Sequence, residues 1–203
     1  MWYVIQTITG KEQELVNTIK QVLIYERKKY QRCFVIYQEC SYRVHGVPEF
    51  HIEPLFPSYV FAETDTPEEF FLELKRVPRM SKLLGTEGCF WSIHEKEEEF
   101  LLHMMQEGKR ENTVLELKQN EVMRGFYPNE EGKHQDKEYL IRPSLVQVDG
   151  DGRIKKADGI LGCYIDKIVK QRLRKRSVVI EVPFGGKKRR IRLGIRLEGD
   201  SVE

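Results

Sequence analysis

The chain has no long apolar run and no recognisable export signal. No apolar stretch approaches the roughly 18 residues that a membrane-spanning helix requires. The N-terminus begins Met1-Trp2-Tyr3 without a basic segment or a small-residue cleavage site. We therefore expect no membrane association, and we expect the protein to act in a bacterial-type cytoplasm.

Cysteine is scarce, and its spacing is not that of a metal site. The chain has four cysteines, namely Cys33, Cys40, Cys89 and Cys163. No pair has C-x-x-C spacing, and no group of neighbouring histidines complements them. The sequence predicts reduced thiols that pack as small apolar side chains. It predicts neither a metal site nor a cofactor.

The motifs of common enzyme classes are missing as well. G-x-S-x-G, H-E-x-x-H, G-x-x-x-x-G-K-S/T and G-x-G-x-x-G do not occur. One predicted helix carries an acidic cluster, Glu95, Glu97, Glu98 and Glu99. Acidic residues favour a solvated helix start, which is a simpler interpretation than an acid–base pair. We predict no catalytic residues and no enzymatic activity.

Charge is distributed unevenly behind a net charge of +2. Residues 1–108 contain 12 Lys and Arg against 17 Asp and Glu, whereas residues 141–203 contain 16 against 8. Such asymmetry predicts two modules with different partners. The basic C-terminal module is the candidate for binding a polyanion.

Residues 1–108 alternate between strand-like and helix-like segments. The strand candidates are Tyr3–Ile8, Cys33–Tyr37, Tyr59–Ala62 and Lys82–Leu84. Capping boxes at Thr9 and Ser92, together with Thr66-Pro67, indicate three helix starts. The resulting β-α-β-β-α-β-α order predicts an α+β domain of the ferredoxin-like kind. Residues 43–53 are expected to form a loop or an irregular hairpin.

The rest of the chain divides into a polar region and a β-rich region. Residues 109–148 are expected to be a linker region, although 112–123 fit either a strand or a short helix. We expect residues 124–140 to let the two modules tumble independently. Residues 149–203 predict a small β-barrel. Its strand candidates are Tyr164–Val169, Ser177–Val182 and Arg190–Leu197, with a turn at Pro183–Gly186.

Ten cations of the β-rich module are the candidates for binding RNA. They are Lys167, Lys170, Arg172, Arg174, Lys175, Arg176, Lys187, Lys188, Arg189 and Arg190. The guanidinium group of arginine can donate two parallel hydrogen bonds to a phosphate, and clustered positive charge releases counterions from the nucleic acid on binding. A merely solubilising surface is the alternative. Only Tyr164 and Phe184 interleave the cations, which favours structured RNA over stacking on a single strand.

An aromatic group lies at the start of the third predicted strand. Period-two alternation places Tyr59 and Phe61 on one side of this strand and Val60 on the other. Either these rings belong to the core, or one pair is exposed. An exposed aromatic patch commonly marks a protein interface.

Several of these segments resemble a known family. They are Trp2-Tyr3-Val4, Thr9-Gly10-Lys11-Glu12, Phe56-Pro57-Ser58-Tyr59-Val60-Phe61 and Val77-Pro78-Arg79 with Leu84-Gly85. Over residues 1–107 the sequence resembles the NusG family of transcription elongation factors. The resemblance implies an N-terminal, NGN-type domain that binds the clamp helices of RNA polymerase. The aromatic pocket implied for this contact contains Trp2, Phe56 and Tyr59.

Residues 150–199 resemble a KOW domain, and they resemble one branch of the family in particular. The KOW-like segments are residues 158–162 and 182–185. Ile160 stands where the family has proline, and Gly186-Lys187-Lys188 forms an unusually basic tip. These two features depart from the usual family pattern. Residues 172–176 and 193–196 resemble the LoaP branch of antitermination factors. That resemblance implies a monomer that engages an RNA hairpin in the nascent transcript, alongside other elongation factors.

Two alternatives accompany this interpretation. One is a ribosome- or translation-linked adaptor that binds RNA through its KOW domain alone. The other is an RfaH-like factor whose C-terminal module refolds into helices. The β-branched residues Val178, Val179 and Ile180 argue against a stable helical form. Whether a termination factor or a ribosomal protein is also recruited is left open.

Overall fold

The computed structural model describes residues 1–25, 32–44, 47–77, 82–83, 85–86, 89–90, 92–107, 140–198 and 200. The expectations for residues 109–139, including the strand or helix at 112–123, therefore lie outside the described residues. Within the described ranges, no helix is both long enough and apolar enough to cross a membrane.

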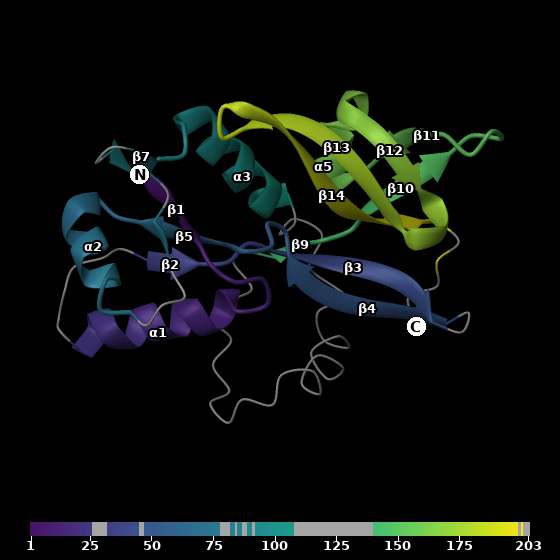
Figure 1. Ribbon diagram of the computed structural model, residues 1–203. Helices are drawn as coiled ribbons and strands as arrows, with labels where there is room; N and C mark the ends of the chain where they lie inside the picture. Colours follow the sequence, from purple (N-terminus) through teal and green to yellow (C-terminus); the bar gives the residue numbers. More distant parts are fainter. Residues whose placement is uncertain are drawn as a thin grey trace.

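A four-stranded sheet lies at the centre of the N-terminal part (Figure 1). Its strand order is β2-β5-β1-β6, formed by β1 (Trp2–Gln6), β2 (Arg32–Phe34), β5 (Tyr59–Glu63) and β6 (Lys82–Leu83). The described residues of this part contain three helices, namely α1 (Glu12–Tyr25), α2 (Pro67–Leu74) and α3 (Glu95–Glu107). This mixed α+β architecture confirms the fold class that the sequence predicts.

Both faces of this sheet are buried, because each strand presents apolar side chains on alternate sides. Ile5 and Val60 face α1 and α2, where they pack with residues such as Leu15 and Phe70. Trp2, Phe34 and Phe61 belong to the cluster on the opposite face, together with residues of α3.

The segment expected to be irregular is a long hairpin. β3 (Tyr37–Val44) and β4 (Val47–Pro54) pair antiparallel over their whole length. β9 (Leu140–Ile141) adds a third strand parallel to β3. The short strands β7 (Gly85–Thr86) and β8 (Cys89–Phe90) form a separate pair.

The C-terminal part is a curled five-stranded sheet. Its order is β11-β10-β14-β13-β12, from β10 (Ser144–Val148), β11 (Ile154–Ala157), β12 (Ile168–Arg172), β13 (Ser177–Phe184) and β14 (Lys187–Leu197). The two edge strands approach each other, since the Ile154 amide donates to Oε1 of Gln171 at 3.2 Å. The sheet thus closes toward the predicted small barrel, and it is consistent with a KOW domain.

Three details of this part differ from expectation. β10 begins at Ser144 and pairs parallel with β14, so the sheet starts inside the expected linker region. The first predicted strand is instead a 3₁₀ turn, Ile165–Lys167, followed by β12. The described residues from 144 to 197 contain five strands and only one short α-helix, α5 (Gly159–Gly162), which is not the helical form of the RfaH-like alternative.

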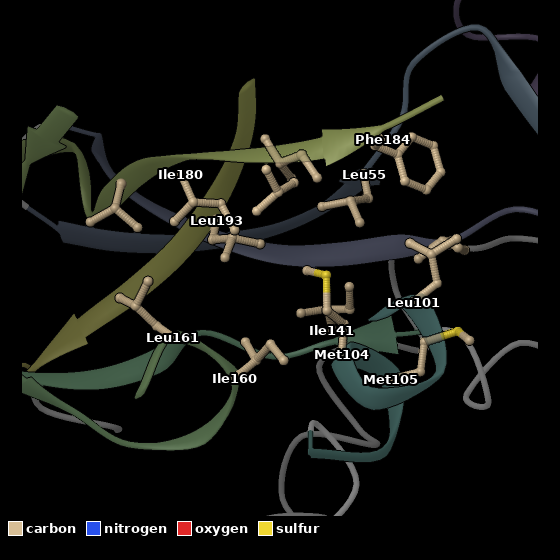
Figure 2. Packing of buried hydrophobic residues seen from close by; sticks show 14 of the residues in the cluster. Leu55, Leu101, Met104, Met105, Ile141, Ile160, Leu161, Ile180, Phe184 and Leu193 are labelled. Carbon is tan, nitrogen blue, oxygen red and sulfur yellow. The ribbon is translucent and has the colours of Figure 1, made fainter. Parts of the chain in front are cut away.

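The two parts share one hydrophobic core (Figure 2). Side chains from α3, β9, α5, β13 and β14 meet there, and they include Leu101, Met104, Met105, Ile141, Ile160, Leu161, Ile180, Phe184 and Leu193. β14 also crosses β3 at close range, because a Cβ at Gly194 would lie 2.5 Å from the Glu39 carbonyl oxygen. This packing differs from the independent modules that the sequence predicts.

Candidate functional site

A sharp turn between β4 and β5 carries Phe56 and leads into Tyr59. Ser58 has a φ of 72° in this turn, a left-handed conformation that few side chains adopt without support. Its amide donates to Oε1 of Glu12 at 2.8 Å, and its carbonyl accepts from the Thr7 amide at 2.8 Å. The turn is therefore held by the segment that precedes α1.

The predicted capping box at Thr9 serves this turn. The Thr9 hydroxyl lies 2.5 Å from the Ser58 hydroxyl, and the nearly buried Glu12 carboxylate accepts from the Ser58 amide. Neither side chain makes the reciprocal cap that the T-x-x-E pattern predicts. The pattern lies just before α1, which begins at Glu12, and both of its polar groups position the aromatic turn.

Four aromatic rings, which we call the aromatic patch, lie on the sheet face opposite α1 and α2. They are Trp2, Phe34, Phe56 and Phe61. Trp2 is 1% exposed and meets the edge of Phe34 at 5.0 Å between centroids. Phe61 is 1% exposed, so of the two alternatives that the sequence leaves open the core interpretation holds for Phe61. The shared core covers this face of the sheet.

The proposed pocket residues therefore occupy different environments. Trp2 belongs to the core, whereas Phe56 and Tyr59 are half-buried at the rim. The Tyr59 amide donates to the Phe56 carbonyl at 3.2 Å, which places the two residues at the same turn. Phe56 meets the edge of Phe61 at 5.7 Å, so its ring extends the aromatic patch outward.

Phe184 of the C-terminal sheet covers Phe56. The two rings stack at 5.2 Å between centroids with an interplanar angle of 15°. Gly185 and Gly186 follow with φ values of 63° and 67°, which allow a tight two-residue hairpin turn. The Gly185 amide donates to Oε1 of Glu97 on α3 at 2.8 Å. The β13–β14 turn is thus attached to the N-terminal part by a ring stack and a hydrogen bond.

The basic residues form two groups at opposite ends of β13. Arg172 pairs with Ser177 at the start of the strand, and Lys187 pairs with Phe184 at its end. A strand of this length separates the groups by roughly 24 Å. Lys170, Arg172, Arg174 and Lys175 are all exposed and make no ion pair with a residue that the structure describes. We call these four residues the basic ridge.

The other candidate cations have acidic neighbours or lie at the far turn. Lys167 pairs with the adjacent Asp166 at 2.5 Å. Lys188 and Arg190 lie 3.6 Å and 3.3 Å from Glu181, while Lys187 and Arg189 are exposed beside them. These ion pairs are solvent-exposed and weak, so a polyanion can displace them.

Arg176 differs from its neighbours in the same run. Its guanidinium binds both carboxylate oxygens of Asp200 and donates to the Leu173 carbonyl at 2.6 Å. The side chain is only 13% exposed and the backbone has a φ of 45°. In this structure Arg176 is a structural residue, and its guanidinium group is not available to bind a nucleic acid.

A thiol–imidazole–carboxylate group was not found from sequence. Cys40, His51 and Glu53 lie close together on the β3–β4 hairpin, and Arg192 of β14 reaches them. Burial raises the pKa of Cys40 to about 11 and that of Cys33 to about 12. Cys40 and His51 are eleven positions apart in the sequence, and pairing of β3 with β4 brings them together. This spacing matches no common metal-binding motif.

Comparison with known proteins defines the class first and then the family. The family model described as "Transcription termination factor nusG" matches residues 1–102, which is half of the chain and includes the aromatic turn. The chain is thus of the transcription-factor class. It belongs to the NusG family.

Solved structures give weaker likenesses. The structure titled "Domain interaction in Thermotoga maritima NusG" is 15% identical with a TM-score of 0.48, and the match covers 96% of this chain and 93% of that chain. The MjSpt4:Spt5 complex in conformation B is 12% identical with a TM-score of 0.31, over 89% and 83% of the two chains. The comparison with curated protein sequences found no match.

Proposed function

We propose that the protein is a transcription antitermination factor of the LoaP kind. Its N-terminal domain, residues 1–108, binds the clamp helices of RNA polymerase, and its basic C-terminal module binds a hairpin in the nascent RNA. Membership of the NusG family supports the first contact. The observation that carries the second contact is the basic ridge, four exposed cations without ion pairs among the described residues.

The RNA surface that we propose is narrower than the sequence prediction. The basic ridge is its centre, because those side chains point into solvent and have no competing carboxylate among the described residues. Lys167 contributes charge at one margin, whereas Lys187 to Arg190 form a second, distant contact. An RNA that touches both groups must extend along β13. Arg176 supports the ridge from within through Asp200.

The polymerase surface that we propose is the rim formed by Phe56 and Tyr59. Phe56 packs against Phe61, and Trp2 packs against Phe61 from the core. Aromatic side chains at such rims commonly dominate binding energy. In the structure Phe184 occupies the exposed face of Phe56. A polymerase helix can reach that face only after the β13–β14 turn moves away.

RNA binding is tested by titrating the full chain with an RNA hairpin, a single-stranded RNA and duplex DNA at two salt concentrations. Lys170→Ala should weaken binding to all three and reduce the salt slope by about one ion. Arg172→Ala or Arg174→Ala should lower the preference for the hairpin, by about 1–3 kcal/mol if the guanidinium reads a base.

Lys75→Ala is the matched control, because Lys75 is an exposed cation at the end of α2, on the face of the N-terminal sheet opposite the C-terminal part. Its loss should leave hairpin affinity nearly unchanged. Equal affinity of the parent protein for all three nucleic acids would contradict a hairpin-specific role.

Polymerase binding is tested by a pair of variants at the same ring stack. Phe56→Ala should weaken polymerase binding by about thirtyfold, equivalent to about 2 kcal/mol, because an aromatic anchor is lost. Phe184→Ala should strengthen it, because the covering ring is removed while Phe56 stays. Co-purification with polymerase and a binding titration measure both effects.

Changes of opposite sign in the polymerase affinity of these two variants would show that Phe56 is an interface residue. If the ring stack were only structural, both variants would lose polymerase affinity to a similar extent. If the protein co-purifies with ribosomes and neither variant changes polymerase binding, the translation-linked alternative is correct.

A further inference from the structure

A chemically mixed group of side chains lies on one face of the β3–β4 hairpin. Strand register pairs Gln38 with Glu53 and Cys40 with His51, so these four residues lie side by side. Nε2 of His51 lies 3.1 Å from Oε2 of Glu53, and Sγ of Cys40 lies 3.5 Å from Oε1. One ligand atom from each of Cys40, His51 and Glu53 lies within 4.8 Å of the others.

A cation already occupies the edge of this group. Nη2 of Arg192 lies 2.6 Å from Oε1 of Glu53 and 3.6 Å from Sγ of Cys40. Arg192 extends from β14, so this contact joins the C-terminal sheet to the hairpin. Positive charge is therefore favourable at this position. Two potential metal-ligand groups border it, the Glu53 carboxylate and the Cys40 sulfur.

The buried Gln38 side chain completes the surroundings. It is 2% exposed, and its Nε2 donates to Oε1 of Glu53 at 3.0 Å. Its Oε1 accepts no hydrogen bond from any described residue. An unpaired buried acceptor is costly and implies an absent partner. A water bound to a metal ion at the cluster would supply the missing donor.

We propose that Cys40, His51 and Glu53 bind a zinc ion with water as the fourth ligand, and that this ion and the Arg192 guanidinium compete for the same place. Sulfur, imidazole nitrogen and carboxylate oxygen are the ligands that zinc takes, in tetrahedral geometry. Gln38 orients the carboxylate and accepts from the bound water, a role typical of the residues around a metal's ligands.

The existing geometry needs little change to accept the ion. Tetrahedral zinc holds S, N and O ligands roughly 3.3–3.8 Å apart. The His51–Glu53 distance of 3.1 Å is to Oε2, and the Cys40–Glu53 distance of 3.5 Å is to Oε1. One ligand atom from each residue lies within 4.8 Å of the others, so a small side-chain adjustment brings a single carboxylate oxygen into that range. His51 and Glu53 are 24% and 31% exposed, so an ion can enter from solvent. On binding, the Cys40 thiol releases its proton to solvent and the thiolate bonds to the metal.

Competition with Arg192 links the metal to the contact between the two parts of the chain. Zinc at the cluster takes the Cys40 sulfur and a carboxylate oxygen of Glu53, the two groups that the guanidinium now contacts. Two cations at this distance repel each other, so Arg192 must withdraw. This link does not depend on polymerase or RNA binding.

The test is a titration of the full chain with zinc against a chromogenic chelator, and with cobalt(II) as a spectroscopic probe. We expect one ion per chain and a cobalt spectrum with a thiolate charge-transfer band. Cys40→Ser and His51→Ala should each weaken zinc binding by at least about tenfold. Arg192→Ala should tighten it by about threefold or more, because the competing cation is gone.

Controls separate this site from adventitious binding. Cys163→Ser removes an exposed thiol elsewhere and should change nothing. Circular dichroism checks that the Cys40 variant folds, and the partly exposed His51 supplies a second variant that spares the core. Binding that survives both ligand variants, or a cobalt spectrum without a thiolate band, would overturn the site. Unchanged affinity in Arg192→Ala would overturn the competition.

Discussion

Arg176 and Arg174 lie two positions apart, yet their guanidinium groups have different environments. Arg176 is bonded to the Asp200 carboxylate and to the Leu173 carbonyl, and little of it is exposed. Arg174 is exposed on the basic ridge. Removing one partner of a partly buried, hydrogen-bonded ion pair costs stability, whereas removing an exposed charge costs little.

We therefore expect the two arginines to separate stability from RNA binding. Arg176→Ala should lower the free energy of unfolding by about 1.5–3 kcal/mol, because charge-assisted hydrogen bonds of a partly buried pair are lost. Arg174→Ala should change it by less than about 0.5 kcal/mol while weakening RNA binding. Urea denaturation followed by circular dichroism measures the first quantity. Equal stability losses in the two variants would contradict the structural role of Arg176.

At the scale of elements, the crossing of β14 over β3 brings the two parts into backbone contact. Gly194 faces the Glu39 carbonyl and the Cys40 Cα, both backbone atoms that cannot rotate away. A side chain there would collide with the β3 backbone. Glycine is required at this position by close approach, and its φ is not in the left-handed region.

Gly194→Ala should separate the two strands locally and destabilise the protein by about 1–3 kcal/mol, as overpacking in a close-packed site does. Gly150→Ala is the matched control, because no described atom lies within 4 Å of the place a Cβ would take there and its φ is ordinary. Thermal unfolding of both variants gives the comparison. A Gly194→Ala protein as stable as the control would contradict the crossing.

The sequence predicted elements whose apolar period is visible in the chain itself. Such a period is present in α1, α2, β5, β13 and β14. The glycine pair before Lys187 marked the turn between β13 and β14. Residues 43–53, expected to form a loop or an irregular hairpin, belong to the β3–β4 hairpin, which is ordered by pairing and by contact with β14, and contacts between distant segments are not visible in the local sequence. For the same reason the roles of Arg176, Arg192 and Phe184 could not be read from spacing.

At the scale of the whole molecule, the two parts are joined by a continuous core. Apolar side chains of α3, β9 and α5 pack in one cluster with those of β13 and β14 (Figure 2). The ring stack at Phe184 and the ion pair at Arg192 add contacts on either side of this core. Buried apolar area of this kind disfavours independent motion of the parts.

We expect residues 1–107 and 140–198 to share one rotational correlation time in NMR relaxation. Phe184→Ala combined with Arg192→Ala should begin to separate the two values, because both polar and aromatic attachments are lost. Two distinct correlation times in the unmodified protein would instead support the independent modules that the sequence predicts.

The two-residue strand β9 has a consequence for any partner that must displace the C-terminal sheet. Leu140 and Ile141 pair with β3, and only Arg142 and Pro143 precede the first residue of β10. Because this connection is so short, the effective concentration of the C-terminal sheet at the surface of the N-terminal part on which it packs is on the order of millimolar or above. A partner present at micromolar concentration must therefore bind that surface roughly a thousandfold more tightly than the sheet does, unless β9 first dissociates from β3.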